Sequence, residues 1–250
     1  MKISIITPTY NSAKTIKRTI LSIIDQHYNN LEYIIIDGVS TDGTLEIVRS
    51  YQNEINTKFI SEKDNGIYDA MNKGIKLATG NIIGILNSDD FYDDDKVLAV
   101  VAEAFKDQKI EAVYGDIKYF SNDINQIKRY WRAGGYKESK LNYGWTIPHP
   151  TLFLRKNIYD KYGFFNTDFK IAGDYEFILR ILKTYHINTK YIPKVFVRMY
   201  DGGISGRDFK QRMEGWNELK KAWKINNFKV PTFFVFRRIL FKFSQYLFLK

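Results

Sequence analysis

The chain has 250 residues, and its 44% hydrophobic content is enough for the core of one large domain. It has no cysteine, and its three histidines are scattered, which excludes disulfides and metal sites built from cysteines or clustered histidines. The formal net charge of +10 is concentrated at the C-terminal end, where residues 207–250 hold 11 Lys and Arg against 3 Asp and Glu. This segment therefore favours an anionic partner, either phospholipid or nucleic acid.

The first half of the chain alternates short β-branched segments with amphipathic helical patterns. The sequence predicts four strands, at Ile3–Thr7, Tyr33–Ile36, Thr57–Ser61 and Ile82–Leu86. It predicts helices between and after them, at 16–24, 41–51, Gly66–Ala78 and Asp93–Phe105. Strands that are apolar on both faces and separated by helices are typical of a parallel sheet with helices on both sides. The predicted fold class is therefore α/β, with a mostly parallel central sheet.

The pattern changes beyond residue 110. We expect a strand at Ala112–Phe120, an irregular substrate-side segment at Ser121–Tyr143, a strand at Thr151–Leu154 and a helix at Asp174–Thr184. No repeat or low-complexity linker interrupts the sequence. These observations predict one domain over residues 1–205, followed by a basic helical tail over residues 206–250.

The tail carries an apolar stripe at helical spacing, made by Phe233, Phe236, Leu240, Phe243 and Leu247. Arg238, Lys242 and Gln245 lie on the opposite side of this predicted helix. A stripe of this kind usually packs against a core. Here its terminal position and positive flank favour an amphipathic helix that lies on an anionic membrane surface.

The N-terminal apolar run ends at Thr7-Pro8, which makes it too short for a signal peptide. No segment approaches the ~20 apolar residues that a membrane-spanning helix needs. We therefore expect a cytoplasmic protein, held peripherally on the inner face of the plasma membrane by its tail.

Polar residues follow each of the four predicted strands of the first half, where the strands end. They are Thr7–Asn11, Asp37, Glu62–Asp64 and Asn87–Asp90. In open α/β sheets, ligands bind beyond the carboxyl ends of the strands. Turns between strands and helices favour Asn, Asp and Ser in any case, so one group alone carries little weight. Four groups delivered to one edge indicate a binding site.

The adjacent carboxylates of Asp89 and Asp90 repel each other unless a cation or water offsets their charge. A divalent ion there could bridge the two phosphates of a nucleoside diphosphate leaving group. We therefore assign Asp89 and Asp90 to metal binding, and the later run Asp93–Asp95 to the N-terminus of the following helix. The sequence contains neither a Walker A motif nor G-x-G-x-x-G, so it predicts no P-loop or Rossmann dinucleotide site.

Several motifs occur in a fixed order along the first 205 residues. They are Thr7–Asn11, Ile36–Thr44, Ser61–Gly74, Leu86–Asp90, His149-Pro150, Ala172–Glu176 with Arg180, and Gly202–Ser205. Together they resemble the signature of family 2 glycosyltransferases, and most of all the bacterial branch that builds O-antigen, capsule and exopolysaccharide. The resemblance implies the GT-A nucleotide-diphospho-sugar transferase fold and an inverting mechanism. It makes residues 1–90 the nucleotide-sugar half and residues 110–205 the acceptor and catalytic half.

The resemblance also implies roles for individual donor-site residues. Thr7, Pro8 and Tyr10 would line the base pocket, and Asp37 and Asp64 would hydrogen-bond the base and ribose. Further donor contacts would come from Lys73, Asn87 and Ser88. Asp89 and Asp90 would hold Mn²⁺ or Mg²⁺, although Asn87 replaces the first Asp of the family's D-x-D motif and offers only a neutral oxygen.

Asp174 occupies the position of the family's catalytic base. The acidic residue that usually precedes it is Gly173 here, which leaves Asp174 as the candidate and Glu176 as a rival. Asp174 by itself could instead cap the following helix, and Arg180 could pair with Glu176 four residues away. His149 is either a structural histidine or a contact to the acceptor or diphosphate. The Gly202–Ser205 segment is expected either to close over the donor or to form a simple turn.

These features predict an inverting hexosyltransferase. It would move a sugar from a nucleoside-diphosphate sugar, with uridine as the expected base, to a saccharide linked to polyprenyl diphosphate in the synthesis of a bacterial surface polysaccharide. The alternative is a catalytically inactive relative that binds sugar nucleotides or serves as a scaffold, for which Asn87 is the only support. A nucleic-acid-binding role is not expected, because the basic tail is aliphatic and aromatic and contains no nucleic-acid motif.

Overall fold

The computed structural model describes residues 1–52, 54, 56–121, 123–201 and 209–246. Within these residues the strands are β1 (Ile3–Thr9), β2 (Leu31–Asp37), β3 (Thr57–Ser61), β4 (Ile82–Ile85), β5 (Phe91–Tyr92), β6 (Ala112–Phe120), β7 (Ile127–Trp131), β8 (Phe153–Arg155) and β9 (Thr189–Tyr200). The helices are α1 (Ile16–Ile24), α2 (Thr44–Ser50), α3 (Ile67–Leu77), α4 (Val97–Ala104), α5 (Glu138–Leu141), α6 (Lys156–Tyr162), α7 (Gly173–Leu179), α8 (Phe209–Ile225) and α9 (Phe234–Ser244). A 3-10 turn at His149–Thr151 and a π turn at Arg180–Thr184 complete them.

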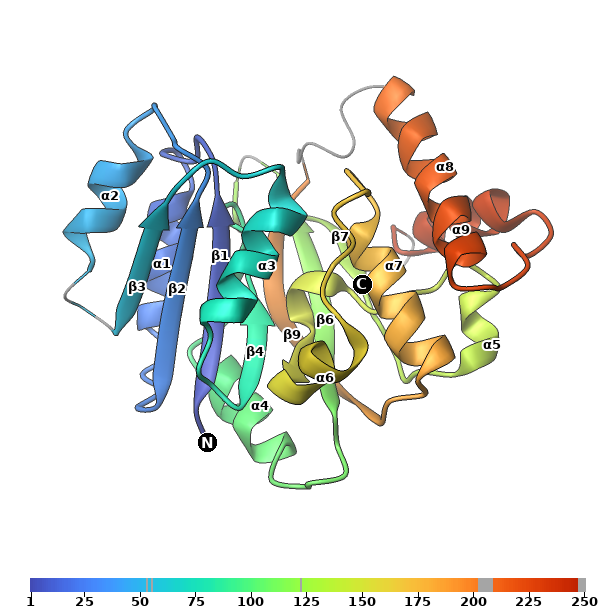
Figure 1. Cartoon of the computed structure of the whole chain (residues 1–250), viewed down its shortest axis with the longest axis horizontal. Helices are drawn as coiled ribbons and strands as arrows, with labels where there is room; N and C mark the ends of the chain where they lie inside the picture. The colour runs from blue at the N-terminus through green and yellow to red at the C-terminus, as the bar shows by residue number, and fades with distance from the viewer. Residues whose placement is uncertain (53, 55, 122, 202–208, 247–250) are drawn as a thin grey trace.

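All the described strands belong to one sheet, in the order β3-β2-β1-β4-β8-β6-β9-β5, with β7 paired to β6 (Figure 1). The β3-β2-β1-β4 half is parallel. The other half is mixed, because β8 runs antiparallel to both β4 and β6 while β6 and β9 are parallel. The carboxyl ends of β1 to β4 therefore meet at one edge, which is where the sequence predicts the binding site.

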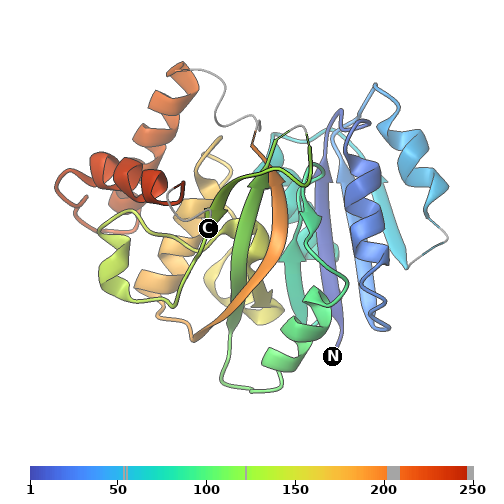
Figure 2. The same ribbon diagram turned by 180° about the vertical axis from the view of Figure 1, so that it is seen from behind.

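Two hydrophobic cores cover the two faces of the sheet. Successive residues of β1 and β2 alternate between them, so that Ile6 and Ile34 pack on the face of α3, α6 and α7, whereas Ile5 and Ile35 pack on the face of α1 and α4. Figures 1 and 2 show these two helical layers from opposite sides. This double burial explains why the strands read as continuous apolar runs.

The first half of the fold follows the sequence closely. Each of the four predicted strands and the helices α1, α2 and α3 form within a few residues of the expected positions. The helix predicted at Asp93–Phe105 instead begins at Val97. The assignment of the aspartates to that helix N-terminus is confirmed in part: Asp93 pairs with Arg198 of β9, whereas Asp94 pairs with Lys194 and also accepts the backbone N–H of Lys96, the N-cap residue, at 2.9 Å.

The second half contains elements that the sequence pattern does not reveal. The Ser121–Tyr143 segment is not irregular throughout, since it forms β7 against β6 and then the short helix α5. The long strand β9 was also missed, because Pro193, two lysines and Arg198 interrupt its apolar pattern. Its pairing with β6 shifts register around this proline, which lacks the N–H that a regular ladder requires. The strand predicted at Thr151–Leu154 begins two residues later than expected, at Phe153.

The C-terminal helices pack on the body of the protein. Trp223 and Ala222 of α8 and Phe234 of α9 are buried in the same core as α7. The indole N–H of Trp223 donates to the hydroxyl of Tyr175 on α7 at 2.8 Å. No helix in the described part of the chain is long and apolar enough to cross a membrane.

Candidate active site

Turns after β1 and β2 form the donor side of the site, and they are hydrogen-bonded to each other. Asn11 accepts a bond from the backbone N–H of Thr41 at 2.9 Å and donates its own N–H to the hydroxyl of Ser40 at 2.8 Å. Asp42 accepts the N–H of Ala13 at 3.0 Å. Ser88 joins this edge from the β4 side, since its hydroxyl lies 2.8 Å from that of Ser12. The motifs that are far apart in sequence thus form one connected platform.

Asp37 lies beneath this platform with no exposed surface. Its carboxylate accepts bonds from the N–H and hydroxyl of Ser40 and from the hydroxyl of Ser61, the last at 2.6 Å. In the structure, this residue therefore fixes the turns that follow β2 and β3. The expected contact of Asp37 with the base or ribose stays a prediction.

The solvent-facing part of the platform is formed by Tyr10 and Asp64. Tyr10 is 65% exposed, as an aromatic platform for a planar base would be. A Cβ on Gly38 would lie 2.7 Å from a carboxylate oxygen of Asp64, so this glycine lets the two loops approach. Thr7 and Pro8, in contrast, are buried in the sheet, and the hydroxyl of Thr7 accepts a bond from Tyr33 at 3.1 Å.

Lys73 lies on α3, near the loop that carries Asp64. Its ammonium donates to the carbonyl of Lys63 at 2.8 Å and pairs with Glu62 at 2.9 Å. Hydrogen bonding to Glu62 raises the pKa of Lys73, so the side chain is charged at neutral pH. It places one fixed positive charge beside the donor edge, as a nucleotide-binding role requires.

The two carboxylates of the Asn87–Asp90 segment, which follows β4, differ in their exposure to solvent. Asp89 is partly exposed, whereas Asp90 is completely buried and accepts a bond from the amide of Asn87 at 3.3 Å. Burial, and then the neighbouring Asp89, raise the pKa of Asp90 well above its ordinary value. Arg18 is the nearby cation; burial lowers its pKa, while Asp90 and Asp89 act in the opposite direction.

This segment offers oxygen atoms that suit a hard cation. One side-chain oxygen of Asn87 and one of Asp90 are buried without a hydrogen-bond partner, and Asp89 presents a carboxylate toward solvent. No three Asp, Glu, His or Cys side chains in the described ranges gather into a metal cage. A site of this kind fits Mg²⁺ or Mn²⁺ held by one or two protein oxygens together with the phosphates of a ligand.

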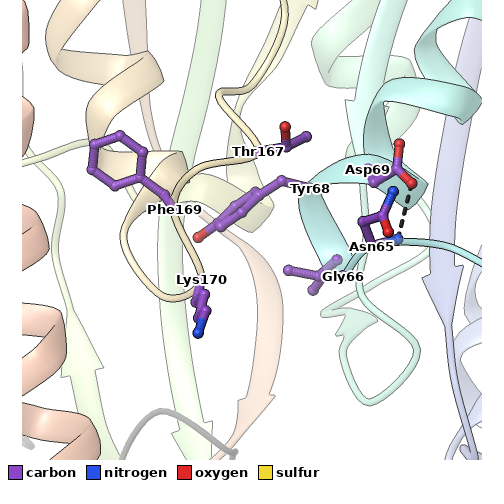
Figure 3. A pocket seen from close by; sticks show the side chains of 8 residues that line it. Asn65, Gly66, Tyr68, Asp69, Thr167, Phe169 and Lys170 are labelled. Atoms are coloured by element: carbon purple, nitrogen blue, oxygen red, sulfur yellow. Dashed lines mark hydrogen bonds between the residues drawn. The ribbon is translucent and has the colours of Figure 1, made fainter.

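Asp174, the predicted base, lies in the first turn of α7 and is partly exposed. Tyr68, at the start of α3, places its hydroxyl 3.2 Å from the Asp174 carboxylate and 2.9 Å from the carbonyl of Ile171. Burial, and then the Asp174 carboxylate, raise the pKa of Tyr68, so this phenol stays protonated and donates. Figure 3 shows Tyr68 reaching from the Asn65–Asp69 turn toward the loop of Phe169 and Lys170, where these residues line a cavity of about 90 Å³.

The packing of Tyr68 explains the glycine at position 173. A Cβ on Gly173 would lie 2.7 Å from the ring of Tyr68. The space that a side chain would need is therefore filled by the aromatic ring. Tyr68 is a site residue that the sequence alone did not single out, although it belongs to the Ser61–Gly74 motif.

Glu176 has a structural role that removes it as a rival base. It is 2% exposed and forms an ion pair with Arg180, with N–O distances of 3.0 and 3.2 Å. Asn226 of α8 donates to the same carboxylate at 3.1 Å. Arg180 also donates to the carbonyls of Tyr162 and Phe164, so the pair connects α7 to the end of α6. The expected pairing of Glu176 with Arg180 is confirmed.

Glu218 of α8 holds the loop that leads into Asp174. Its carboxylate accepts the backbone N–H groups of Lys170, Ile171 and Ala172 at 2.9, 2.9 and 2.7 Å. Asp174 itself does not cap α7, because the N-cap position is Ala172 and no side-chain cap forms. Sequence reasoning missed Glu218, since nothing in a helical tail indicates which of its charges faces inward.

His149 is 8% exposed, and its Nε2 has no hydrogen-bond partner. Its ring packs edge-on against Phe165, with 5.8 Å between the ring centres. Burial lowers the pKa of His149, so the imidazole is neutral at pH 7, although the charge of Asp174 acts in the opposite direction. Phe165 in turn stacks on Tyr68 with 5.8 Å between ring centres, and Tyr68 donates to Asp174. The Gly202–Ser205 motif lies outside the described residues.

The apolar stripe of α9 faces outward. Phe233, Phe236, Leu240 and Phe243 are each more than half exposed, and Leu247 lies outside the described residues. Its predicted polar flank is divided: Lys242 is exposed and Gln245 is buried, while Arg238 lies over the ring of Tyr175 and donates to the carbonyl of Gly144 at 2.7 Å. Arg238 is therefore directed toward the protein and away from any surface the stripe would meet.

Comparison with known proteins places this geometry in a family. Residues 4–173 match the model of glycosyl transferase family 2. The chain belongs to this family. It is similar to a PGL/p-HBAD biosynthesis glycosyltransferase of Mycobacterium bovis, with 31% identity over 207 residues that cover 81% of this chain and 78% of the relative. It is 33% identical to the chondroitin synthase of Escherichia coli over 72% of this chain but only 26% of that protein.

This family 2 glycosyltransferase has the GT-A fold, as expected from the resemblance of its motifs. It superposes over its whole length on 76% of S. aureus TarS 1–349 in complex with UDP-GlcNAc, with a TM-score of 0.72 and 20% identity. The mannosyltransferase PcManGT of Pyrobaculum calidifontis, in complex with GDP-Man and Mn²⁺, gives a TM-score of 0.67 at 20% identity over 99% of this chain and 70% of that one. These two likenesses describe the fold.

Proposed function

We propose that this glycosyltransferase is an inverting hexosyltransferase that uses a UDP-sugar and a saccharide acceptor in the synthesis of a bacterial surface glycan. The observation that carries the proposal is the arrangement around Asp174. The carboxylate of Asp174 is partly exposed and accepts a hydrogen bond from Tyr68 at the start of α3, whereas the neighbouring Glu176 is paired with Arg180. TarS bound to UDP-GlcNAc, together with the PGL and chondroitin enzymes, supports a UDP donor and a glycan product.

The reaction requires one proton transfer and one exchange of bonds at the anomeric carbon. An acceptor hydroxyl oxygen attacks that carbon, its bond to the diphosphate oxygen breaks, and the nucleoside diphosphate leaves with the electron pair. Asp174 takes the proton of the attacking hydroxyl as general base. Tyr68 orients the carboxylate through its hydroxyl, and the unpartnered Nε2 of neutral His149 is proposed as a hydrogen-bonding atom for the acceptor.

The experiment is to replace Asp174 by Asn, which keeps the shape of the side chain but removes its basicity. UDP-sugar turnover is expected to fall by roughly 10²–10⁴, the range for loss of general-base assistance, while UDP affinity measured by calorimetry stays unchanged. Glu176→Gln serves as the comparison, because it is expected to lower the melting temperature rather than the turnover of the folded enzyme. Normal turnover in Asp174→Asn, with a dead but folded Glu176→Gln, contradicts the assignment. A wild type that binds UDP but transfers and hydrolyses nothing favours the inactive alternative.

We propose that Asp89 supplies the direct protein ligand to Mn²⁺ or Mg²⁺, and that Asn87 and buried Asp90 support it from behind. A bound divalent cation would neutralise the charge that develops on the departing diphosphate. PcManGT in complex with Mn²⁺ supports this expectation for the fold. Asp89→Ala is expected to abolish activation by Mn²⁺. Equal activity of the wild-type enzyme in excess chelator and in excess Mn²⁺ excludes the metal role.

We further propose that the exposed α9 stripe places the enzyme on the inner face of the plasma membrane, where its acceptor is lipid-linked. Exposed apolar side chains on one side of a terminal helix are typical of an interfacial helix. The double variant Phe236→Ser/Phe243→Ser is expected to sediment far less with anionic phospholipid vesicles. The variant Ile225→Ser, on an exposed position of α8, is the control. Equal sedimentation of the double variant and the wild type removes the stripe from the membrane contact.

A further inference from the structure

Three basic side chains lie on β7 and α9, two elements that pack together, with the guanidinium of Arg129 5.6 Å from the ring centre of Tyr246 at the end of α9. Arg129 comes from β7, and Arg238 and Lys242 come from one side of α9, where they are four residues apart. The end of α9 is bound to β7, because the backbone N–H of Tyr130 donates to the carbonyl of Gln245 at 3.4 Å. The cations are therefore held on packed elements, and their separation does not depend on a free chain end.

Arg129, Arg238 and Lys242 pack against other parts of the protein, but in the described part of the chain none of them pairs with a carboxylate. The guanidinium of Arg129 lies 3.5 Å from the ring centre of Tyr119, and its Nε is buried without an acceptor. Arg238 lies 5.0 Å from the ring centre of Tyr175. Across the residues that the structure describes, none of the three cations forms an ion pair with a carboxylate, and Lys242 forms no hydrogen bond.

The electrostatic surroundings show that the three charges act on one another. Displaced hydration lowers the pKa of Lys242 to about 7, and Arg238 and Arg129 add to the effect by repulsion. Burial likewise lowers the pKa of Arg238. The ring over which Arg238 lies belongs to Tyr175, the residue that follows Asp174 in α7, and the charge of Asp174 opposes the lowering of the pKa of both α9 cations. Cations gathered without an anion become favourable when a phosphate binds between them.

The outward side of the same helix indicates what carries the anion. Phe236, Leu240 and Phe243 are 60%, 54% and 66% exposed on the side of α9 opposite to Arg238. A ligand that satisfies both sides of α9 has an anionic group and an apolar chain. The diphosphate of the donor could bind only to the cationic side of α9. The predicted platform for the donor is formed instead by the turns after β1 to β4.

We propose that Arg129, Arg238 and Lys242 form a second anion subsite, which binds the phosphate or diphosphate of a lipid-linked acceptor beside Asp174. The subsite rests on the proposed function, since an acceptor must reach the base. It assigns α9 two tasks: its outer side meets the lipid, and its inner side binds the group that joins lipid to sugar. The acceptor sugar would then extend from the subsite toward Asp174 and the anomeric carbon of the donor.

The test uses farnesyl diphosphate as the probe and the full chain saturated with UDP, so that the donor site is blocked. Lys242→Gln and Arg129→Gln are each expected to weaken farnesyl diphosphate binding by about 10–100-fold, the range for a lost charge-assisted bond. Their UDP affinity, measured without the probe, is expected to match that of the wild type. Lys220→Gln, an exposed position of α8, is the matched control and is expected to bind the probe normally. Lys242 is exposed, so its variant is expected to fold even where Arg129→Gln does not.

Several results overturn the proposal. Equal binding of farnesyl diphosphate by the wild type and Lys242→Gln removes the lysine from the subsite. An equal loss of UDP affinity in the variants assigns the cations to the donor diphosphate instead. Farnesol bound as tightly as farnesyl diphosphate excludes anion recognition, and inorganic diphosphate bound as tightly excludes the lipid. Failure of the proposed function is a separate result, since a wild type without UDP binding or sugar transfer still reports its affinity for the probe.

Discussion

The donor edge and the α9 side of the active site differ in how the protein treats their charged groups. At the donor edge the carboxylate of Asp37 has no exposed surface and accepts three hydrogen bonds from Ser40 and Ser61. On the α9 side Arg238 and Lys242 have no carboxylate partner among the described residues. The carboxylate of Asp37 is therefore satisfied within the protein, whereas Arg238 and Lys242 have charges that an anionic ligand would neutralise.

This difference indicates which polar groups stabilise the fold and which are available to bind a ligand. A platform whose polar groups are already bonded is rigid, so it can bind a nucleotide without first being ordered. Unpaired cations lower the stability of the free protein, but they leave binding energy available for an anion. Substitutions at the two regions are therefore expected to have opposite effects on stability.

The largest expected effect belongs to Asp37→Ala. Removing this carboxylate leaves buried donors of Ser40 and Ser61 without partners, so the free energy of unfolding is expected to fall by about 2–4 kcal/mol. Urea denaturation measures it. The control is Asp64→Ala, whose partly exposed carboxylate accepts one backbone N–H, that of Gly66 at 2.9 Å; its expected loss is below about 1 kcal/mol.

Donor affinity measured on the same two variants sharpens the comparison. If Asp37→Ala keeps wild-type stability but no longer binds UDP, Asp37 is a direct contact to the ligand and its structural role is minor. If Asp64→Ala binds UDP normally, the carboxylate of Asp64 does not contact the nucleotide. Either result changes which of the two aspartates forms the pocket.

Most of the fold of the first half could be predicted from the sequence, because its strands are buried on both faces and its helices are amphipathic. The second half could not, since β7 and β9 owe their existence to pairing with β6 and not to a local pattern. Pro193 in β9 is a local argument against a strand, and the tertiary contact overrides it. Here non-local pairing decided the structure.

The candidate site divides in the same way. Asp174 was singled out because it lies within a motif that resembles the family's, and its carboxylate accepts a hydrogen bond from Tyr68, while its role as the base stays a prediction. Glu218 and the α9 cations were out of reach, because a basic amphipathic tail does not reveal which side faces the protein. Gly173 could be read from the sequence, but the reason for a glycine there could not. That reason is the close packing of the Tyr68 ring, which lies 105 residues earlier in the chain.

The second expected effect concerns Gly173→Ala. The added methyl group would lie 2.7 Å from the Tyr68 ring, and relieving this clash moves the phenol that orients Asp174. Turnover is expected to fall about tenfold through lost positioning, with UDP affinity unchanged. Gly135→Ala is the matched control, since nothing lies within 4 Å of a Cβ there. Wild-type turnover in Gly173→Ala shows that Tyr68 is not needed to position the base.

The smallest expected effect has the opposite sign, and it is a gain in stability from Lys242→Gln. The pKa of Lys242 is about 7 in the folded protein, below the ~10.4 of an unfolded chain, because lost hydration, Arg238, Arg129 and Arg212 disfavour its charge more than Asp174 favours it. Below pH 7 the lysine is charged in both states, so the full penalty is present. As pH rises from 7 toward 10 the folded state releases its proton first, and the penalty fades.

Because part of the Lys242 side chain reaches solvent while its ammonium group loses hydration, water screens the charge incompletely, and Lys242→Gln is expected to gain only about 0.5–1 kcal/mol at pH 6 and almost nothing at pH 9.5. Chemical denaturation at both pH values measures this, with Lys220→Gln on α8 as the control that gains at neither. Adding farnesyl diphosphate at pH 6 is expected to reverse the order, because the bound anion stabilises the wild type more than the variant. A variant that is less stable than the wild type at pH 6 without the probe means that Lys242 already has a favourable partner in the free protein. Lys242 would then be a satisfied charge, as Asp37 is at the donor edge, and the two sides of the site would not differ at this residue.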